Sequence, residues 1–85
     1  MIIKYKPSFL KEYKKFSNDL KTKIRKRIEL FRLNPHEPSL KVHPLKGRMS
    51  GFYSFSVNHS LRIVFLYEGK DVVVLLLIGG HEIYQ

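Results

Sequence analysis

The spacing of apolar residues predicts two helices near the N-terminus. Pro7 suits the first turn of a helix, and the two apolar stripes that follow have helical periodicity. The first stripe is Phe9, Leu10, Tyr13 and Phe16, and the second is Leu20, Ile24, Ile28 and Phe31. Either Ser17 or Asn18 can cap the second helix, with Asp19 in its first turn, and Asn34-Pro35 ends it. The segment is therefore a helical hairpin whose apolar faces point the same way.

Four segments have the pattern of β-strands. Ile2–Tyr5 is short and partly β-branched, whereas Gly51–Val57 alternates between apolar residues and serines. Tyr53, Phe55 and Val57 fall on one face of this strand, and Ser54 and Ser56 fall on the other. Leu61–Tyr67 and Val72–Ile78 are nearly continuous apolar runs, typical of central strands that are covered on at least one face. Residues 58–60 and 68–71 supply the turns, and residues 36–50 are predicted to be a loop with some extended pairing.

This order of elements predicts one α+β domain that spans residues 1–85. An N-terminal strand and an αα-hairpin pack on a small, largely antiparallel sheet in the order β-α-α-β-β-β. The hairpin must cover one face of the sheet, because no other segment is available to bury that face. The opposite face is expected to be open for a ligand.

Charge is the unusual feature of the composition. Sixteen lysines and arginines oppose seven acidic residues, for a net charge of +9 and a pI near 10.0. Such a field attracts polyanions, with nucleic acid as the first candidate, although an acidic protein is also compatible. The second predicted helix is rich in cations and has only Asp19 and Glu29 to balance them. We expect its polar face, including Lys23 and Arg27, to bind RNA phosphate or an acidic partner rather than serve only as a solvated surface.

Several functional classes are disfavoured. The chain has no cysteine, which removes disulfides, zinc–cysteine sites and thiol nucleophiles. No two histidines have the spacing of metal ligands, so we expect neither a metal nor another cofactor. The longest apolar run, Val72–Ile78, is far shorter than the ~20 residues that a membrane helix needs. The start of the chain does not have the apolar stretch of a signal peptide, so we expect a cytoplasmic protein that does not contact membranes.

Strand pairing brings distant polar residues together. A turn centred near residues 69 and 70 places Arg62 opposite about Leu77, and a turn near residue 59 places Arg62 opposite Ser56. His81 follows the last strand and should join them at one end of the sheet. Arg62 interrupts an apolar run, so it either pairs with an acid such as Glu82 or lies on the open face, where it can meet a phosphate.

The motifs in the second half of the chain resemble those of a known family. They are the H-P-L-K-G segment at residues 43–47, the G-F-Y-S-F-S-V and L-R-I-V-F strands, and the closing I-G-G-H-E-I-Y. As a set they resemble the RelE/ParE-superfamily toxins of bacterial toxin–antitoxin pairs, most closely the YafQ-like branch, over essentially the whole chain. The resemblance implies a RelE-like fold and an endoribonuclease that cleaves mRNA in the ribosomal A site. It also implies a cognate antitoxin, which we expect to be acidic and to form a hetero-oligomer with the toxin.

The resemblance also assigns roles to residues. By position, His43, Arg62 and His81 match catalytic residues, with Arg62 holding phosphate, and Tyr84 matches an aromatic residue that stacks on a base. Lys46 matches a basic position, and we expect Lys46 and Arg48 to hold the RNA backbone. RNA supplies its own nucleophile, the 2′-hydroxyl, so cleavage needs only a base, an acid and cations. His43 is favoured as the base and His81 as the acid, although the sequence does not fix that order.

The chain also departs from the family. Ser54, Ser56 and Ser60 stand where relatives carry catalytic lysines, or a histidine and an aspartate, and Tyr84 follows His81 by three residues instead of four. Two other functions therefore stay open. One is a ParE-like toxin that inhibits a protein such as gyrase without cleaving RNA, and the other is a basic RNA- or ribosome-binding module without toxicity. Loss of the strand cations favours the first of these, whereas the histidines and Arg62 favour the nuclease.

Overall fold

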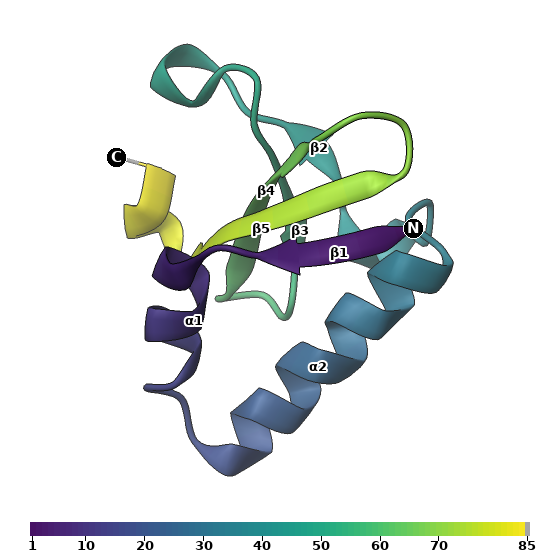
Figure 1. The fold of residues 1–85 in the computed structure, drawn as a ribbon. Helices are drawn as coiled ribbons and strands as arrows, with labels where there is room; N and C mark the ends of the chain where they lie inside the picture. The colour runs from purple at the N-terminus through teal and green to yellow at the C-terminus, as the bar shows by residue number, and fades with distance from the viewer. Residues whose placement is uncertain (85) are drawn as a thin grey trace.

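The computed structural model describes residues 1–84, and for His81 and Tyr84 it describes the backbone alone. The helices are α1 (Pro7–Tyr13) and α2 (Asn18–Leu33). The strands are β1 (Ile2–Tyr5), β2 (His43–Pro44), β3 (Tyr53–Ser56), β4 (Arg62–Tyr67) and β5 (Val72–Gly79). Three short 3-10 turns are η1 (Pro38–Leu40), η2 (Gly47–Met49) and η3 (His81–Tyr84). Figure 1 shows both helices on one side of the sheet, so the α+β prediction is confirmed.

The sheet has five strands in the order β1-β5-β4-β3-β2. Strand β1 pairs in parallel with β5, and the other neighbours are antiparallel. All four predicted strands are present, and the fifth is the two-residue β2, which lies inside the segment predicted to be a loop with some extended pairing. In β2, His43 pairs with Ser54 of β3. Within residues 1–84, neither helix is long and apolar enough to cross a bilayer.

The helical hairpin forms largely as predicted. The Ser17 hydroxyl accepts a hydrogen bond from the backbone N–H of Leu20 at 3.2 Å and so caps α2. Helix α1 is shorter than its apolar stripe: it ends at Tyr13, whose carbonyl accepts a bond from the N–H of Phe16 in a tighter turn. Phe16 therefore packs against the core from the connection between the helices and not from a helical face.

Phe31 of α2 joins the helix to the sheet. Its ring is fully buried and stacks on Phe55 of β3, with ring centroids 4.4 Å apart. It also contacts Phe65 of β4 at 4.9 Å. Aromatic pairs at these distances stabilise a core beyond the area that they bury. Ile24 and Ile28 continue the same buried stripe toward the start of the helix.

The sheet face opposite the helices differs from expectation at its centre. The predicted alternation is correct, with Phe55 in the helix-side core and the two serines on the other face. However, Ser54 and Val64 are completely buried and Ser56 is 6% exposed, so the middle of this face is not open. Exposed polar residues of this face, such as His43, lie nearer its edge.

A β-bulge changes the pairing of β4 with β5. Phe65 pairs with Leu75 but Val64 pairs with Leu77, so one residue of β5 is skipped. The pairing of Tyr67 with Val73 would by itself place Arg62 opposite Ile78, and the bulge moves it one residue further, so that Arg62 lies opposite Gly79 instead of the predicted position near Leu77. The pairing of Arg62 with Ser56 is as predicted.

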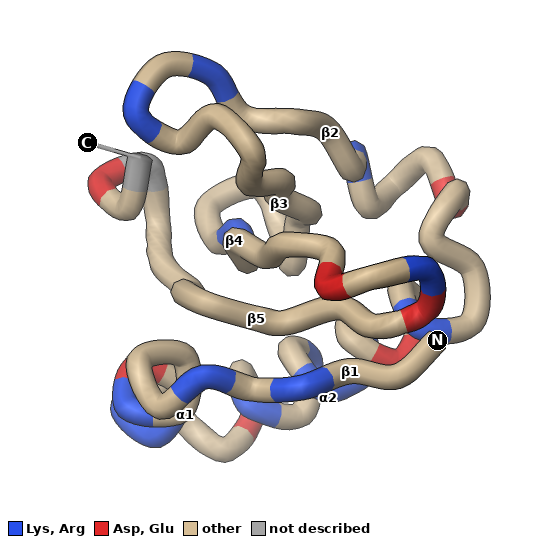
Figure 2. Tube along the Cα trace, turned by 45° about the horizontal axis from the view of Figure 1, so that its top comes forward, with Lys and Arg blue, Asp and Glu red and all other residues tan. Residues whose placement is uncertain are grey.

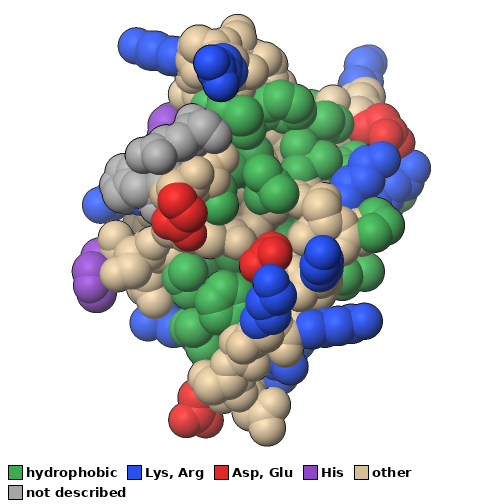
Figure 3. Space-filling view, turned by 90° about the vertical axis from the view of Figure 1, so that its left-hand side faces the viewer, with side chains coloured by type: hydrophobic (Ala, Val, Ile, Leu, Met, Phe, Trp, Pro, Cys, Tyr) green, Lys and Arg blue, Asp and Glu red, His purple; other side chains and the backbone are tan. Residues whose placement is uncertain are grey.

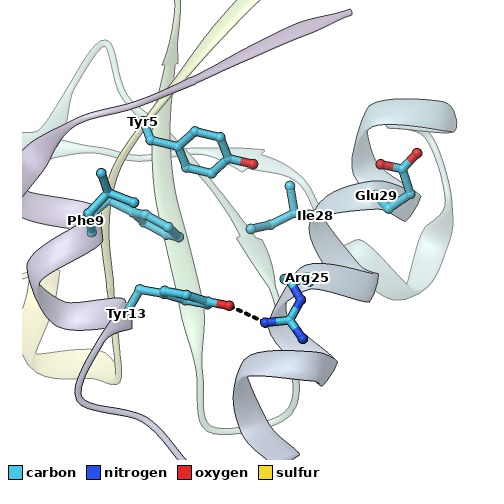
Figure 4. A pocket seen from close by; sticks show the side chains of 7 residues that line it. Tyr5, Phe9, Tyr13, Arg25, Ile28 and Glu29 are labelled. Atoms are coloured by element: carbon cyan, nitrogen blue, oxygen red, sulfur yellow. Dashed lines mark hydrogen bonds between the residues drawn. The ribbon is translucent and has the colours of Figure 1, made fainter. Parts of the chain in front are cut away.

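A groove of about 360 Å³ separates α1 from α2. Tyr5, Phe9 and Tyr13 line one side of it, and the Tyr13 hydroxyl accepts a 2.6 Å hydrogen bond from Arg25 across the groove (Figure 4). Partial burial raises the pKa of Tyr5, because the phenolate is poorly solvated there. The bond between Tyr13 and Arg25 ties the two helices together at their solvent side.

We predict that Phe31→Ala destabilises the fold severely. The truncation leaves a cavity against Phe55 and Phe65, and such substitutions lower the free energy of unfolding by about 3–5 kcal/mol. Urea unfolding followed by circular dichroism measures the change. Leu33→Ala is the control: Leu33 is 68% exposed in the same helix, so its truncation should change stability by about 0.5 kcal/mol or less. Equal destabilisation of the two variants would contradict the role given to Phe31.

Candidate functional site

The predicted site residues occupy two neighbouring rows across the sheet. His43 pairs with Ser54, and Arg62 pairs with Ser56 on one side and Gly79 on the other. Because side chains two residues apart on a strand share a face, these rows lie about 7 Å apart on the face opposite the helices. His43 and Arg62 are therefore near one another on the same surface, separated by the strand that carries the serines.

His43 is held in one orientation. It is exposed at the outer edge of the sheet, and its Nδ1 lies 2.7 Å from the backbone carbonyl oxygen of Lys41. A carbonyl only accepts, so Nδ1 carries the hydrogen and Nε2 is the nitrogen available to solvent. Lys41 itself has a left-handed backbone, with φ of 51°, which an ordinary residue adopts at some cost. That conformation positions the carbonyl that orients the histidine.

Arg62 binds Ser56 rather than an acid. One guanidinium nitrogen, Nη1, donates a 2.6 Å hydrogen bond to the Ser56 hydroxyl. In the described part of the chain, Arg62 makes no ion pair, and its side chain is half-buried. The Ser56 hydroxyl thus holds the Arg62 guanidinium on the sheet face opposite the helices.

Arg27 reaches the same serine from the other side of the domain. It projects from α2, and its Nε and Nη2 donate to the backbone carbonyl of Ser56 at 3.2 and 3.1 Å. Its guanidinium also donates to the Ser39 carbonyl at 2.9 Å and to the Ser39 hydroxyl at 3.2 Å. Arg27 is thus fixed between η1 and β3, whereas the sequence suggested a cation on the outward polar face of the helix.

Ser39 is held in turn by Glu37. The Glu37 carboxylate accepts bonds from the hydroxyl and the N–H of Ser39, and the former is very short. These bonds, with a smaller contribution from the charge of Arg27, keep the pKa of Glu37 below its ordinary value. A continuous chain of hydrogen bonds therefore runs from Glu37 through Ser39 and Arg27 to Ser56 and Arg62.

Ser56 lies in a basic pocket of about 360 Å³, called here the Ser56 pocket. Its lining residues are Lys23, Arg27, Ser39, Lys41, Ser56, Val57, Asn58, His59 and Arg62. The sequence pointed to Lys23, Arg27 and Arg62 but not to Lys41 or His59, which resemble ordinary loop and turn residues. No local signal marks those two, because their approach to Arg62 depends on the turns before β2 and β4.

His43 lines a separate hollow. The neighbouring space of about 320 Å³ is bounded by His43, Pro44, Leu45, Lys46 and Met49. Lys46 and His43 line this hollow together, and Arg48 is exposed in η2. Figure 2 shows lysine and arginine positions on the loop between β2 and β3, which projects beyond the edge of the sheet.

The C-terminal turn folds back at the end of β5. A Cβ added to Gly79 would lie only 2.5 Å from the Ile83 side chain, so the glycine allows η3 to pack closely. The backbone of His81 therefore begins next to the row of Arg62 and Ser56. The side chains of His81 and Tyr84, predicted as acid and stacking residue, lie outside the described residues.

Hydrophobic side chains gather in the middle of the face that Figure 3 shows, with lysines and arginines around them.

We predict that Ser56→Ala lowers the free energy of unfolding by about 1–2 kcal/mol, because it removes a buried hydroxyl that accepts a hydrogen bond from Arg62. Urea unfolding measures this change. Ser60→Ala is the control, since Ser60 is exposed and its hydroxyl makes no hydrogen bond within residues 1–84. A Ser56 variant as stable as the Ser60 variant would show that the Arg62 bond does not contribute to stability.

Comparison with known proteins identifies the fold. No protein-family model and no curated protein sequence matches the chain. Solved structures do match: a YoeB/ParE toxin from Agrobacterium tumefaciens, 22% identical, aligns with a TM-score of 0.77 over 95% of this chain and 99% of its own. YafQ from Escherichia coli, 21% identical, aligns with a TM-score of 0.78 over 95% and 93% of the two chains. A YoeB–YefM complex from Staphylococcus aureus, 25% identical, aligns with a TM-score of 0.74 over 95% and 97%. This chain has the fold of the RelE/ParE toxin superfamily, as its sequence motifs predict.

Proposed function

We propose that this protein is the toxin of a toxin–antitoxin pair and that it cleaves mRNA in the ribosomal A site. The observation that carries the proposal is the placement of His43 and Arg62 in neighbouring rows on one face of the sheet. The shared fold with proteins named as toxins supports the toxin role. A net charge of +9 suits a protein that must approach RNA.

The reaction needs no nucleophile from the protein. The 2′-hydroxyl of RNA attacks the adjacent phosphorus and forms a 2′,3′-cyclic phosphate, while the bond to the 5′-oxygen of the next nucleotide breaks. Nε2 of His43 takes the proton from the 2′-hydroxyl, and His81 gives a proton to the departing 5′-oxygen. Arg62 stabilises the negative charge on the phosphorane oxygens, since its guanidinium offers further donors beyond the one bound to Ser56.

The remaining predicted contacts position the RNA. Lys46 lines the hollow beside His43, and Arg48 is exposed a little further along the projecting loop. Both hold RNA phosphates on the side of His43, the proposed general base. Tyr84 stacks on a base next to the cleaved bond, which keeps the 2′-hydroxyl aligned with the leaving oxygen.

We further propose that an acidic antitoxin covers the basic surface and keeps the toxin inactive. One of the matching structures is a heterotetrameric YoeB–YefM toxin–antitoxin complex from Staphylococcus aureus, which supports a protein partner of this kind. A positively charged chain and a negatively charged partner associate quickly, because long-range attraction steers their encounter.

A ParE-like toxin that binds a protein target without cleaving RNA is the second candidate. The burial of Ser54 and Ser56 favours it, since small buried hydroxyls replace the strand residues that relatives use for proton transfer. Under this alternative, His43 and His81 have no chemical role.

We predict that His43→Ala reduces mRNA cleavage by about 10²–10⁴-fold, the usual contribution of a positioned general base. Arg62→Ala and His81→Ala should also abolish most of the cleavage. Primer extension on a reporter mRNA in a purified translation reaction, with and without ribosomes, measures new 5′ ends. His36→Ala is the control, because His36 lies in the loop after α2 and lines neither hollow.

The outcomes separate the candidates. New ends that need ribosomes and disappear in the His43 and His81 variants support the nuclease and the roles of both histidines. Arrest of translation without any new ends supports the binding toxin. Ends that persist unchanged in both variants would overturn this catalytic assignment even though the enzyme is a nuclease.

A further inference from the structure

Two arginines converge on one serine without a neutralising carboxylate. Arg62 donates to the Ser56 hydroxyl at 2.6 Å, and Arg27 donates twice to the Ser56 carbonyl. Ser56 is 6% exposed, so the two guanidinium groups meet at a mostly buried point. Neither arginine makes an ion pair in the described part of the chain. Glu37 acts on Arg27 electrostatically, but its carboxylate is bonded to Ser39.

The rest of the Ser56 pocket adds positive charge. Lys23 comes from α2, Lys41 from the segment before β2, and His59 from the turn between β3 and β4. Among the described residues, no acidic side chain lines the pocket. Like charges this close repel one another, most strongly where protein excludes part of the water. An anion that enters the pocket would relieve this repulsion.

The pocket is also shaped in advance. Arg27 is fixed by bonds to Ser39 and Ser56, and Arg62 is fixed by the Ser56 hydroxyl. The Asn58 side-chain oxygen accepts the N–H groups of Ser60 and Leu61, which sets the turn and leaves the Asn58 amide N–H groups as donors at the rim. Binding here therefore costs little entropy, because these groups are already ordered.

The directions of these donors fit a phosphate better than a carboxylate. A carboxylate is planar and is satisfied by a single guanidinium fork. Here the cations that line the pocket come from the sheet, from α2, from the turn between β3 and β4 and from the segment before β2. A ligand in the pocket would therefore have cations on several sides. A tetrahedral phosphate group presents oxygens in more than one plane and can use all of these directions.

We infer that the Ser56 pocket binds a phosphate of the RNA strand next to the phosphate that is cleaved. The inference rests on the proposed function and adds a second subsite to it. His43 and Lys46 line one hollow, and Arg27, Lys23 and Lys41 line the neighbouring one. Arg62, which belongs to the second hollow and shares a sheet face with His43, connects them. A strand that crosses both hollows is held on each side of the reacting bond.

We predict that Lys23→Gln with Lys41→Gln weakens binding of short single-stranded RNA about tenfold at low salt. Removal of each phosphate contact should reduce the slope of log affinity against log salt concentration by about 0.7. Fluorescence anisotropy with a 2′-O-methyl RNA, which has no free 2′-hydroxyl and cannot be cleaved, measures binding by the whole protein. Lys11→Gln with Lys14→Gln is the matched control, because it removes the same charge from the α1 region, outside the Ser56 pocket.

A second variant tests the contribution of the Arg27 guanidinium to RNA binding, with its effect on folding measured separately. Arg27→Gln should weaken RNA binding similarly, but Arg27 also supports Ser39, so its urea unfolding is measured in parallel. The double lysine variant carries the test if Arg27→Gln is unstable, since both lysines are exposed. Equal affinities and salt slopes in the two double variants would overturn the inference.

Other ligands give different results. The double lysine variant is also compared with the wild type for binding of a polyglutamate peptide. If that variant loses peptide binding but keeps RNA binding, the pocket binds an acidic protein and the RNA subsite is overturned. Inorganic phosphate alone could stabilise the wild type but not the double lysine variant. If the two proteins then bind RNA equally well, the pocket binds a free anion and the inference fails. Binding of uncleavable RNA does not depend on catalysis. A protein that binds RNA through the pocket but never cleaves mRNA would therefore refute the proposed cleavage, while the assignment of the pocket to an RNA phosphate would stand.

Discussion

The stacking of Phe31 on Phe55 is the contact on which the arrangement of the site depends. It fixes helix α2 to strand β3 at one point, with ring centroids 4.4 Å apart. Arg27 lies one helical turn before Phe31, and Ser56 follows Phe55 directly. The aromatic contact therefore also brings the Arg27 guanidinium to the Ser56 carbonyl. Packing in the core therefore determines where the Arg27 guanidinium is held.

The residue at position 56 differs from the type that the family resemblance implies. Where the resemblance predicts a basic or acid–base residue on this strand, the protein has a small serine that binds two arginines. Positive charge at this position thus comes from α2 and β4 instead of from β3. Because a guanidinium stays charged at all ordinary pH values, the arrangement suits phosphate binding and not proton transfer. The proton transfers of the proposed reaction accordingly fall to His43 and His81.

The edge of the sheet sets the orientation of the His43 side chain. Strand β2 is only two residues long, yet it pairs His43 with Ser54 and thereby sets the face on which the histidine lies. The left-handed Lys41 places its carbonyl on Nδ1 of the same ring. The left-handed residue and the two paired residues together set the orientation of the His43 ring.

The sequence by itself determined the elements and part of the site. Apolar periodicity located both helices and the four longer strands, and the short turn after β3 was enough to pair Arg62 with Ser56. Family motifs singled out His43 and Arg62 and predicted the fold. These features depend on residues close together in the chain, or on a pattern that repeats along it.

Tertiary structure alone decided the remaining features. The β-bulge moved Arg62 one residue further along β5, to a position opposite Gly79, and no residue type indicates such a bulge in advance. Burial of Ser54 and the meeting of Arg27 with Arg62 follow from how helix, sheet and loops pack in three dimensions. A charged side chain looks the same in the sequence whether it points to solvent or to a carbonyl across the domain. Its partner is set by contacts between segments far apart in the chain.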